Sequence, residues 1–197
     1  AYYEQGRFEE ALKDFTDALN LNLRIPHVYL GRAKTFYELG NRDMAIVDYS
    51  RVIDADHGNV HALVGRARVY REQDNDAAAL ADLARAAEVE PKFAQHRYQR
   101  AVIFFQNEKY EETVKETAIA VNLDPQFVAA WGLQGVANYR LDHKNEATHD
   151  FENVMKLLPA DPLARVWHGR VVMALDRFQD AIKDFREALR IDNKYVP

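Results

Sequence analysis

The sequence contains no cysteine. This absence excludes a disulfide framework and any metal site built on thiolates. It fits a reducing cytoplasm, which we favour, and also a periplasmic protein without disulfides, so the compartment stays unknown. No glycine-rich phosphate loop follows a predicted strand, and no nucleophile elbow is present. We therefore expect no cofactor and no enzyme activity from this segment.

Long apolar runs are missing as well. No stretch approaches 18 consecutive apolar residues, and no charged-then-apolar leader stands at the start, so we expect no membrane insertion by this segment. The first residue is alanine rather than methionine, and we expect the segment to be part of a longer protein. A hydrophobic content of 48% with 29% charged residues is ordinary for a folded domain in water.

A 34-residue repeat runs through the chain without insertions. Its clearest copy carries Trp131 and Gly135 on one predicted helix, Ala147 and Phe151 on the next, and Pro159 at the end. The same register divides the chain into residues 1–25 (a partial copy), 26–59, 60–93, 94–127, 128–161 and 162–195.

Small residues recur at three places in every complete copy. Two helices joined by a short turn approach closely only where their facing side chains are small, so these places predict helical hairpins. Because a lone hairpin of two short helices is marginal in water, each must stack on the next. The residues are Ala33, Ala45 and Val52; Ala67, Ala79 and Ala86; Ala101, Thr113 and Ala120; Gly135, Ala147 and Val154; Gly169, Ala181 and Ala188.

The period and the residue types of this pattern resemble the tetratricopeptide repeat (TPR), a helix–turn–helix unit. The resemblance covers essentially the whole chain. It implies an all-α fold, a right-handed α-solenoid of stacked hairpins that forms one array over residues 1–197. It also implies a non-enzymatic protein-interaction function, although a fold does not identify a ligand.

The turn inside each hairpin carries Gly40 in the first complete copy, which suits a left-handed helix cap. Later copies have Asp74, Glu108, Asp142 and Asp176 at this place. Because glutamate tolerates the left-handed region poorly, we expect the turn at Glu108 to differ in geometry.

Two rows of polar residues form what we call the charge ladder. A buried arginine without a partner is costly, so we expect ion pairs within or between repeats, with contact to a binding partner as the alternative. Position 7, commonly leucine in the family, holds Arg32, Arg66, Arg100, Gln134 and His168. Position 23 holds Asp14, Asp48, Asp82, Glu116, Asp150 and Asp184.

In the resembling family, the leading helices line a concave groove that binds partners, mainly through positions 2, 5, 9, 12 and 13. Over all these positions this chain has five basic and two acidic residues, a sum of +3, whereas the whole chain carries −5 and the remainder therefore −8. The candidate groove residues that the resemblance implies are His27, Lys34, Tyr37, His61, Arg68, Arg71, Tyr98, Phe105, Tyr139, Arg140, Arg170 and Met173.

A basic groove on an acidic protein predicts a partner that carries acidic groups. Tyr98, Phe105 and Tyr139 are of the type that anchors apolar side chains, although each of them could instead be a core residue between repeats. We therefore expect a protein or peptide partner, an extended or helical segment with acidic and apolar residues.

Three other functions are weighed against this one. Self-association through the ends is the main alternative, because the chain stops at Tyr195-Val196-Pro197 without a polar closing helix. Nucleic-acid binding is weaker, since the isoelectric point is 5.8 and the groove has only five cations. A metal site at His57 and His61, or at Asp142, His143, His149 and Asp150, is less expected than solvated histidines.

Overall fold

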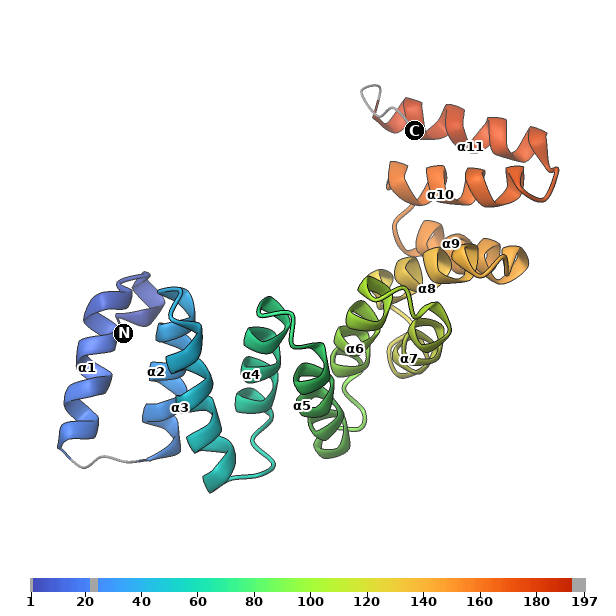
Figure 1. The fold of residues 1–197 in the computed structure, drawn as a ribbon. Helices are drawn as coiled ribbons and strands as arrows, with labels where there is room; N and C mark the ends of the chain where they lie inside the picture. Colours follow the sequence, from blue (N-terminus) through green and yellow to red (C-terminus); the bar gives the residue numbers. More distant parts are fainter. Residues whose placement is uncertain (1, 22–24, 193–197) are drawn as a thin grey trace. The chain divides into compact units, whose positions relative to one another are not determined.

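The structure is a computed structural model that describes residues 2–21 and 25–192. Within these ranges every regular element is a helix (Figure 1). The all-α prediction is therefore confirmed. The sequence pattern predicts a trailing helix from Phe8 to about Asn22 in the partial copy, and Asn22 lies outside the described residues, as do Tyr195 to Pro197. Within the described part, that helix ends at Asn20.

The chain forms two compact units, Ala1–Lys92 and Phe93–Pro197. The boundary between them lies one residue before the predicted boundary between repeats 60–93 and 94–127. A single array over the whole chain stays a prediction. The first unit contains η1 (Tyr3–Gln5), α1 (Phe8–Asn20), α2 (Pro26–Glu38), α3 (Arg42–Ala55), α4 (Val60–Glu72) and α5 (Asp76–Val89). The second contains α6 (Ala94–Gln106), α7 (Tyr110–Leu123), α8 (Val128–Arg140), α9 (Lys144–Leu157), α10 (Pro162–Met173) and α11 (Phe178–Ile191).

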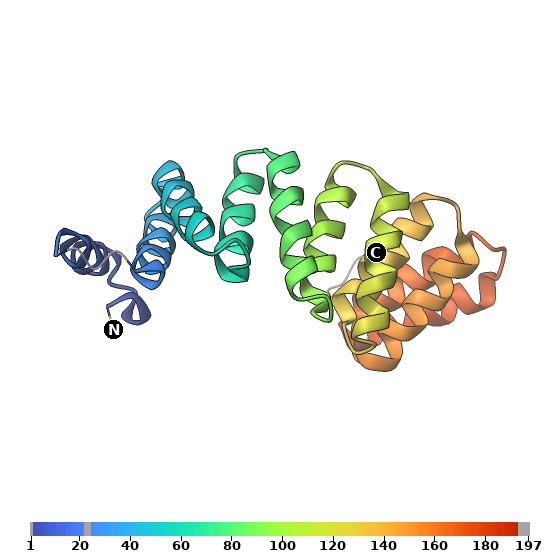
Figure 2. The same ribbon diagram turned by 90° about the horizontal axis from the view of Figure 1, so that it is seen from below.

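Each complete repeat folds as a hairpin of a leading and a trailing helix. The pairs α2/α3 and α4/α5 lie side by side in both views of the first unit, and α6/α7, α8/α9 and α10/α11 form the hairpins of the second (Figures 1 and 2). Within each unit, a trailing helix also packs against the next leading helix, as α3 does on α4 and α9 on α10. The solenoid of stacked hairpins that the resemblance implied is confirmed at this level.

The small positions are buried, as expected for close helix contacts. A Cβ atom added to Gly135 would come within 2.9 Å of the Phe151 ring, so the absence of a side chain lets that ring lie against α8. A glycine also allows close packing between neighbouring hairpins, because a Cβ at Gly65 of α4 would lie 2.5 Å from the Tyr49 ring of α3. Larger residues at these positions would force the helices apart.

The turns inside the hairpins share one geometry. Gly40 has a φ of 78°, and Glu108 has a φ of 57°, the same as Asp74. The expectation that Glu108 would differ is wrong. The backbone N–H of Glu108 donates to the Phe105 carbonyl and that of Lys109 to the Phe104 carbonyl, at 3.0 and 2.9 Å. These capping hydrogen bonds hold the left-handed conformation against the preference of glutamate.

The charge ladder consists of contacts within hairpins. Arg66 donates to both carboxylate oxygens of Asp82 at 2.8 Å, and Arg32 pairs with Asp48 at 2.6 and 3.0 Å. Every pair links a position-7 residue to the position-23 residue 16 places later. The prediction of ion pairs is confirmed for the arginines. The other three rungs are Arg100 with Glu116, Gln134 with Asp150, and His168 with Asp184.

Candidate protein-binding surfaces

In the first unit, Tyr37 of α2 is held between two arginines. The guanidinium carbons of Arg42 and Arg68 lie 4.4 and 4.3 Å from the centre of its ring, and its hydroxyl donates a short hydrogen bond to Glu72. Burial, followed by this hydrogen bond, raises the pKa of Tyr37. With 9% of its surface exposed, Tyr37 supports the arginines and leaves little surface for a partner.

The two arginines share one carboxylate unequally. Arg42 lies 2.6 Å from Glu72, whereas Arg68 lies 3.8 Å away and has 59% of its side chain exposed. Burial tends to raise the pKa of Glu72, but the Tyr37 hydrogen bond and the two arginines lower it on balance. The charges of Arg42, Arg68 and Glu72 sum to +1, and Arg68 is the more weakly paired and the more exposed of the two arginines.

Two further candidates lie together beside α1. His27 and Lys34 of α2 line a pocket of about 380 Å³, together with residues from η1 and α1. Tyr3 and Phe15 supply aromatic surface there, and Asp14 and Glu4 supply carboxylates. The pocket therefore contains both positively and negatively charged side chains.

The last two candidates of the first unit do not line this pocket. His61 of α4 is exposed and Arg71 is half-buried.

In the second unit, the candidate aromatic residues are half-buried and pack against neighbouring rings in tilted or edge-to-face contacts. Tyr98 lies 4.9 Å from Phe127, and Tyr139 lies 6.0 Å from Trp167, between ring centres. Phe105 contacts Tyr110 across the turn after α6. These contacts give the three rings a structural role, and a partner could touch only the part of their surface that stays exposed.

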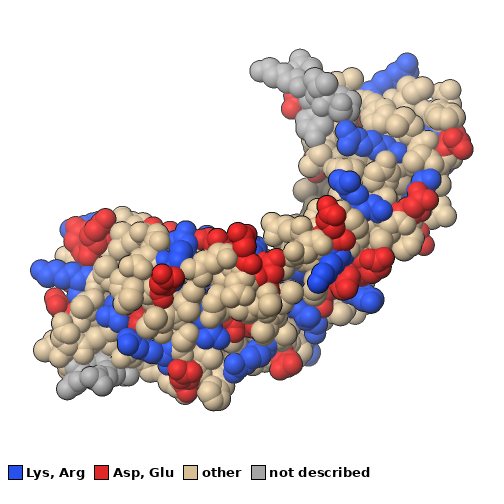
Figure 3. Space-filling model, in the orientation of Figure 1, with Lys and Arg blue, Asp and Glu red and all other residues tan. Residues whose placement is uncertain are grey.

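The remaining candidates of the second unit are exposed to different degrees. Arg170 lies over the Trp167 ring at 5.2 Å, Met173 has 46% of its surface exposed, and Arg140 is exposed at the end of α8. On the face of each unit seen in Figure 3, basic and acidic side chains are interspersed. Sequence reasoning missed the role of Arg42, because the trailing helix was not searched for groove residues.

Comparison with known proteins settles the family. A family model described as the tetratricopeptide repeat matches residues 1–60, 30–89, 64–116 and 143–196. The chain belongs to the tetratricopeptide repeat family. TPR proteins are generally non-enzymatic modules that bind proteins or peptides, so this chain is a protein-interaction module. A search among curated proteins found no match.

Solved structures share the TPR fold at low sequence identity. The C-terminal part of a TPR repeat-containing protein from Cytophaga hutchinsonii has a TM-score of 0.87 at 16% identity, covering 96% of this chain and 76% of that one. A MamA structure has a TM-score of 0.79 at 20% identity, covering 87% and 98%. YrrB, described as a TPR protein with an unusual peptide-binding site, has a TM-score of 0.78 at 18% identity, covering 94% and 95%.

Two features of the described residues bear on other functions. None of the helices in residues 2–21 and 25–192 combines the length and the apolar character that crossing a membrane requires. Over the same residues, no group of three or more histidine and acidic side chains is arranged to hold a metal ion. His57 of the first proposed pair places its Nδ1 atom 2.7 Å from the Ile53 carbonyl oxygen.

Proposed function

We propose that this TPR chain is a non-enzymatic module whose leading helices bind a protein segment rich in acidic and apolar residues. The observation that carries the proposal is the uneven sharing of Glu72. Arg42 takes this carboxylate at 2.6 Å, so the exposed Arg68 can pair with an acidic side chain from outside at little cost.

The candidate residues divide between the two units. Lys34, Arg68 and Arg71 lie in the first unit, whereas Tyr98 and Tyr139 lie in the second, with Phe105. The first unit would therefore bind acidic groups of the partner, and the second unit would bind apolar groups. The half-buried rings support this arrangement, because rigid aromatic side chains bind apolar groups with little loss of conformational entropy.

A peptide array tests the proposal directly. Peptides that combine Asp or Glu with aromatic and aliphatic residues should bind more tightly than peptides in which the acids are replaced by their amides. The double substitution Arg68→Glu and Arg71→Glu should weaken binding and flatten its dependence on salt, since exposed charges are screened within roughly 8–10 Å at ordinary ionic strength.

Matched variants separate charge from contact. The double reversal Arg177→Glu and Arg190→Glu makes the same change in net charge at exposed sites outside the leading helices, and it should leave binding unchanged. Tyr98→Ala should cost roughly 2 kcal/mol of binding free energy with the salt dependence kept. If binding were unchanged by both the Arg68/Arg71 reversal and Tyr98→Ala, the proposal that the leading helices bind the partner would be refuted.

A second candidate function is self-association. The trailing helix α11 exposes Phe178, Ile182 and Leu189 along one side, at 56%, 41% and 43%. Elsewhere within each unit, a trailing helix packs against the next leading helix, as α3 does on α4. A helix of a second copy could do so here. Light scattering over a range of concentrations should then show a rising mass, and Ile182→Glu should abolish the rise; a constant mass would exclude this candidate.

A further inference from the structure

The fourth rung of the charge ladder differs from the others in its chemistry. Asp150 is 2% exposed, yet its partners are two neutral amides, Gln134 at 2.9 Å and Asn138 at 2.7 Å. At the equivalent places, Asp48 and Asp82 are each paired with an arginine. Asp150 is therefore a buried acidic side chain without a cation in its own hairpin.

Glutamine reproduces only the inner part of the missing arginine. Counting along the side chains, Gln134 Nε2 occupies the place of the arginine Nε atom, and both donate to the position-23 carboxylate. The outer part of the guanidinium group, one carbon and two nitrogens, has no counterpart in glutamine. Gln134 Oε1 is buried there and has no hydrogen-bond partner among the described residues.

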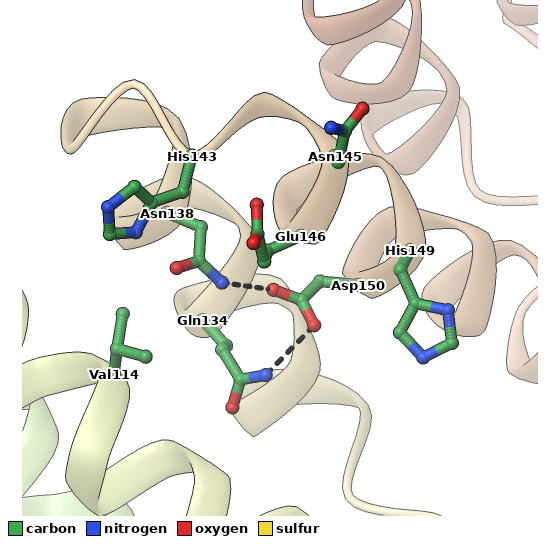
Figure 4. A pocket seen from close by; sticks show the side chains of 8 residues that line it. All are labelled: Val114, Gln134, Asn138, His143, Asn145, Glu146, His149 and Asp150. Atoms are coloured by element: carbon green, nitrogen blue, oxygen red, sulfur yellow. Dashed lines mark hydrogen bonds between the residues drawn. The ribbon is translucent and has the colours of Figure 1, made fainter.

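A pocket of about 530 Å³ opens at this place (Figure 4). Val114 of α7 forms one side, Gln134 and Asn138 of α8 form the floor, and α9 supplies Asp150. In repeat 60–93 the guanidinium of Arg66 donates at 2.8 Å to Asp82 on α5, the residue that corresponds to Asp150, and also to Ser50 on α3. The pocket thus adjoins the carboxylate that, in another repeat of this chain, is paired with a guanidinium group.

The charges of the pocket favour a cation. Its eight described lining residues include Glu146 and Asp150, together with His143, His149 and Asn145, and none is lysine or arginine. Burial raises the pKa of Asp150 to about 6, against the hydrogen bonds from its amides and the influence of His149. A positive group in the pocket would lower the free-energy cost of keeping the buried Asp150 carboxylate ionised. Figure 4 shows Glu146 and Asp150 facing the same space, beside Asn138.

We propose that this pocket binds the guanidinium group of an arginine side chain from a partner protein, which would pair with Asp150 as Arg66 pairs with Asp82 in its own repeat. A carboxylate accepts up to about four hydrogen bonds, and Asp150 receives two within the described residues. A guanidinium group presents several N–H donors in one plane, which suits Asp150 and the unpaired Gln134 Oε1 better than a single ammonium does. None of the lining residues belongs to the candidate groove, so this site is separate from the proposed function.

The test uses N-acetyl-arginine-N-methylamide as the probe, with the citrulline compound as its neutral isostere. In ¹⁵N-resolved NMR titrations at pH 7.5, the arginine compound should shift the amide signals of the pocket residues in α8 and α9. Its affinity should exceed that of the citrulline compound at least tenfold. Equal affinity of the two compounds would overturn the proposal, because the charge of the guanidinium would then contribute nothing.

Two variants locate the binding. Gln134→Arg supplies the missing guanidinium from within the chain, so it should raise thermal stability and weaken probe binding at least tenfold. Gln126→Arg adds the same charge at an exposed turn and should leave binding as in the wild type. Should Gln134→Arg fail to fold, Asp150→Asn provides the same test, with the same loss expected. Wild-type affinity in whichever of these two variants folds would overturn the assignment.

Discussion

Replacing Arg66 with methionine removes one rung of the charge ladder while keeping the aliphatic part of the side chain. Asp82 would lose both of its 2.8 Å hydrogen bonds from the guanidinium, although its side chain is only 5% exposed. Removing one partner of a buried ion pair costs about 3–5 kcal/mol. Because 16% of the Arg66 side chain is exposed, water can reach the site, and we expect a value near the lower end, about 3 kcal/mol.

Urea denaturation followed by circular dichroism measures this loss, by linear extrapolation of the free energy of unfolding to water. The double variant Arg66→Met with Asp82→Leu should recover most of it, since no charge stays buried. Arg190→Met, which breaks a pair on the exposed surface, is the control and should change little. A loss below about 1 kcal/mol for Arg66→Met, or a double variant as unstable as the single one, would refute the structural role of the ladder.

Three further predictions concern other features. Glu108→Gly should stabilise the chain by roughly 0.5–1 kcal/mol in thermal or urea denaturation, because glycine adopts the left-handed turn without strain. Unchanged stability would mean that Glu108 is not strained in this turn. Ala147→Leu should cost roughly 1–3 kcal/mol through overpacking beside Phe151, and a neutral result would show that the hairpin can widen. The pKa of Asp150 is about 6 in the folded chain and about 3.9 in the unfolded chain, so the folded state binds this proton more tightly. The contribution of the protonated Asp150 to stability therefore falls by about 3 kcal/mol as the pH rises from 4 to 6. The difference in stability between the wild type and Asp150→Asn should follow that curve, and a flat difference would contradict it.

The fold was predictable because the 34-residue period repeats the same steric demand in every copy. Small residues such as Ala147 must face another helix, and this requirement places both helices of each hairpin without further information. The turn at Glu108 was predicted wrongly for a physical reason. Intrinsic preference acts on one residue, whereas two capping hydrogen bonds and the helices on either side fix the conformation of the turn.

The candidate site was less accessible from the sequence. Charge counting placed Arg68 among five basic groove residues, but only the structure shows that Arg42 on the next helix lies closer to Glu72 than Arg68 does. The pocket at Asp150 left a trace in the sequence, the replacement of arginine by Gln134 at position 7. This replacement indicates a missing partner for Asp150 only once the structure shows that positions 7 and 23 pair within a hairpin. The sequence alone left pairing between repeats open.

Pairing within a hairpin has a consequence for how such a chain can change in length during evolution. Each complete 34-residue repeat carries both members of its own buried pair. A whole repeat can therefore be duplicated or deleted without leaving a buried charged side chain unpaired. A single residue inserted at the turn after Glu72 would instead move Asp82 relative to Arg66 and separate the two. Gains and losses of sequence are therefore expected as complete repeats or in the connections between hairpins, such as the one after Val89, and not inside them.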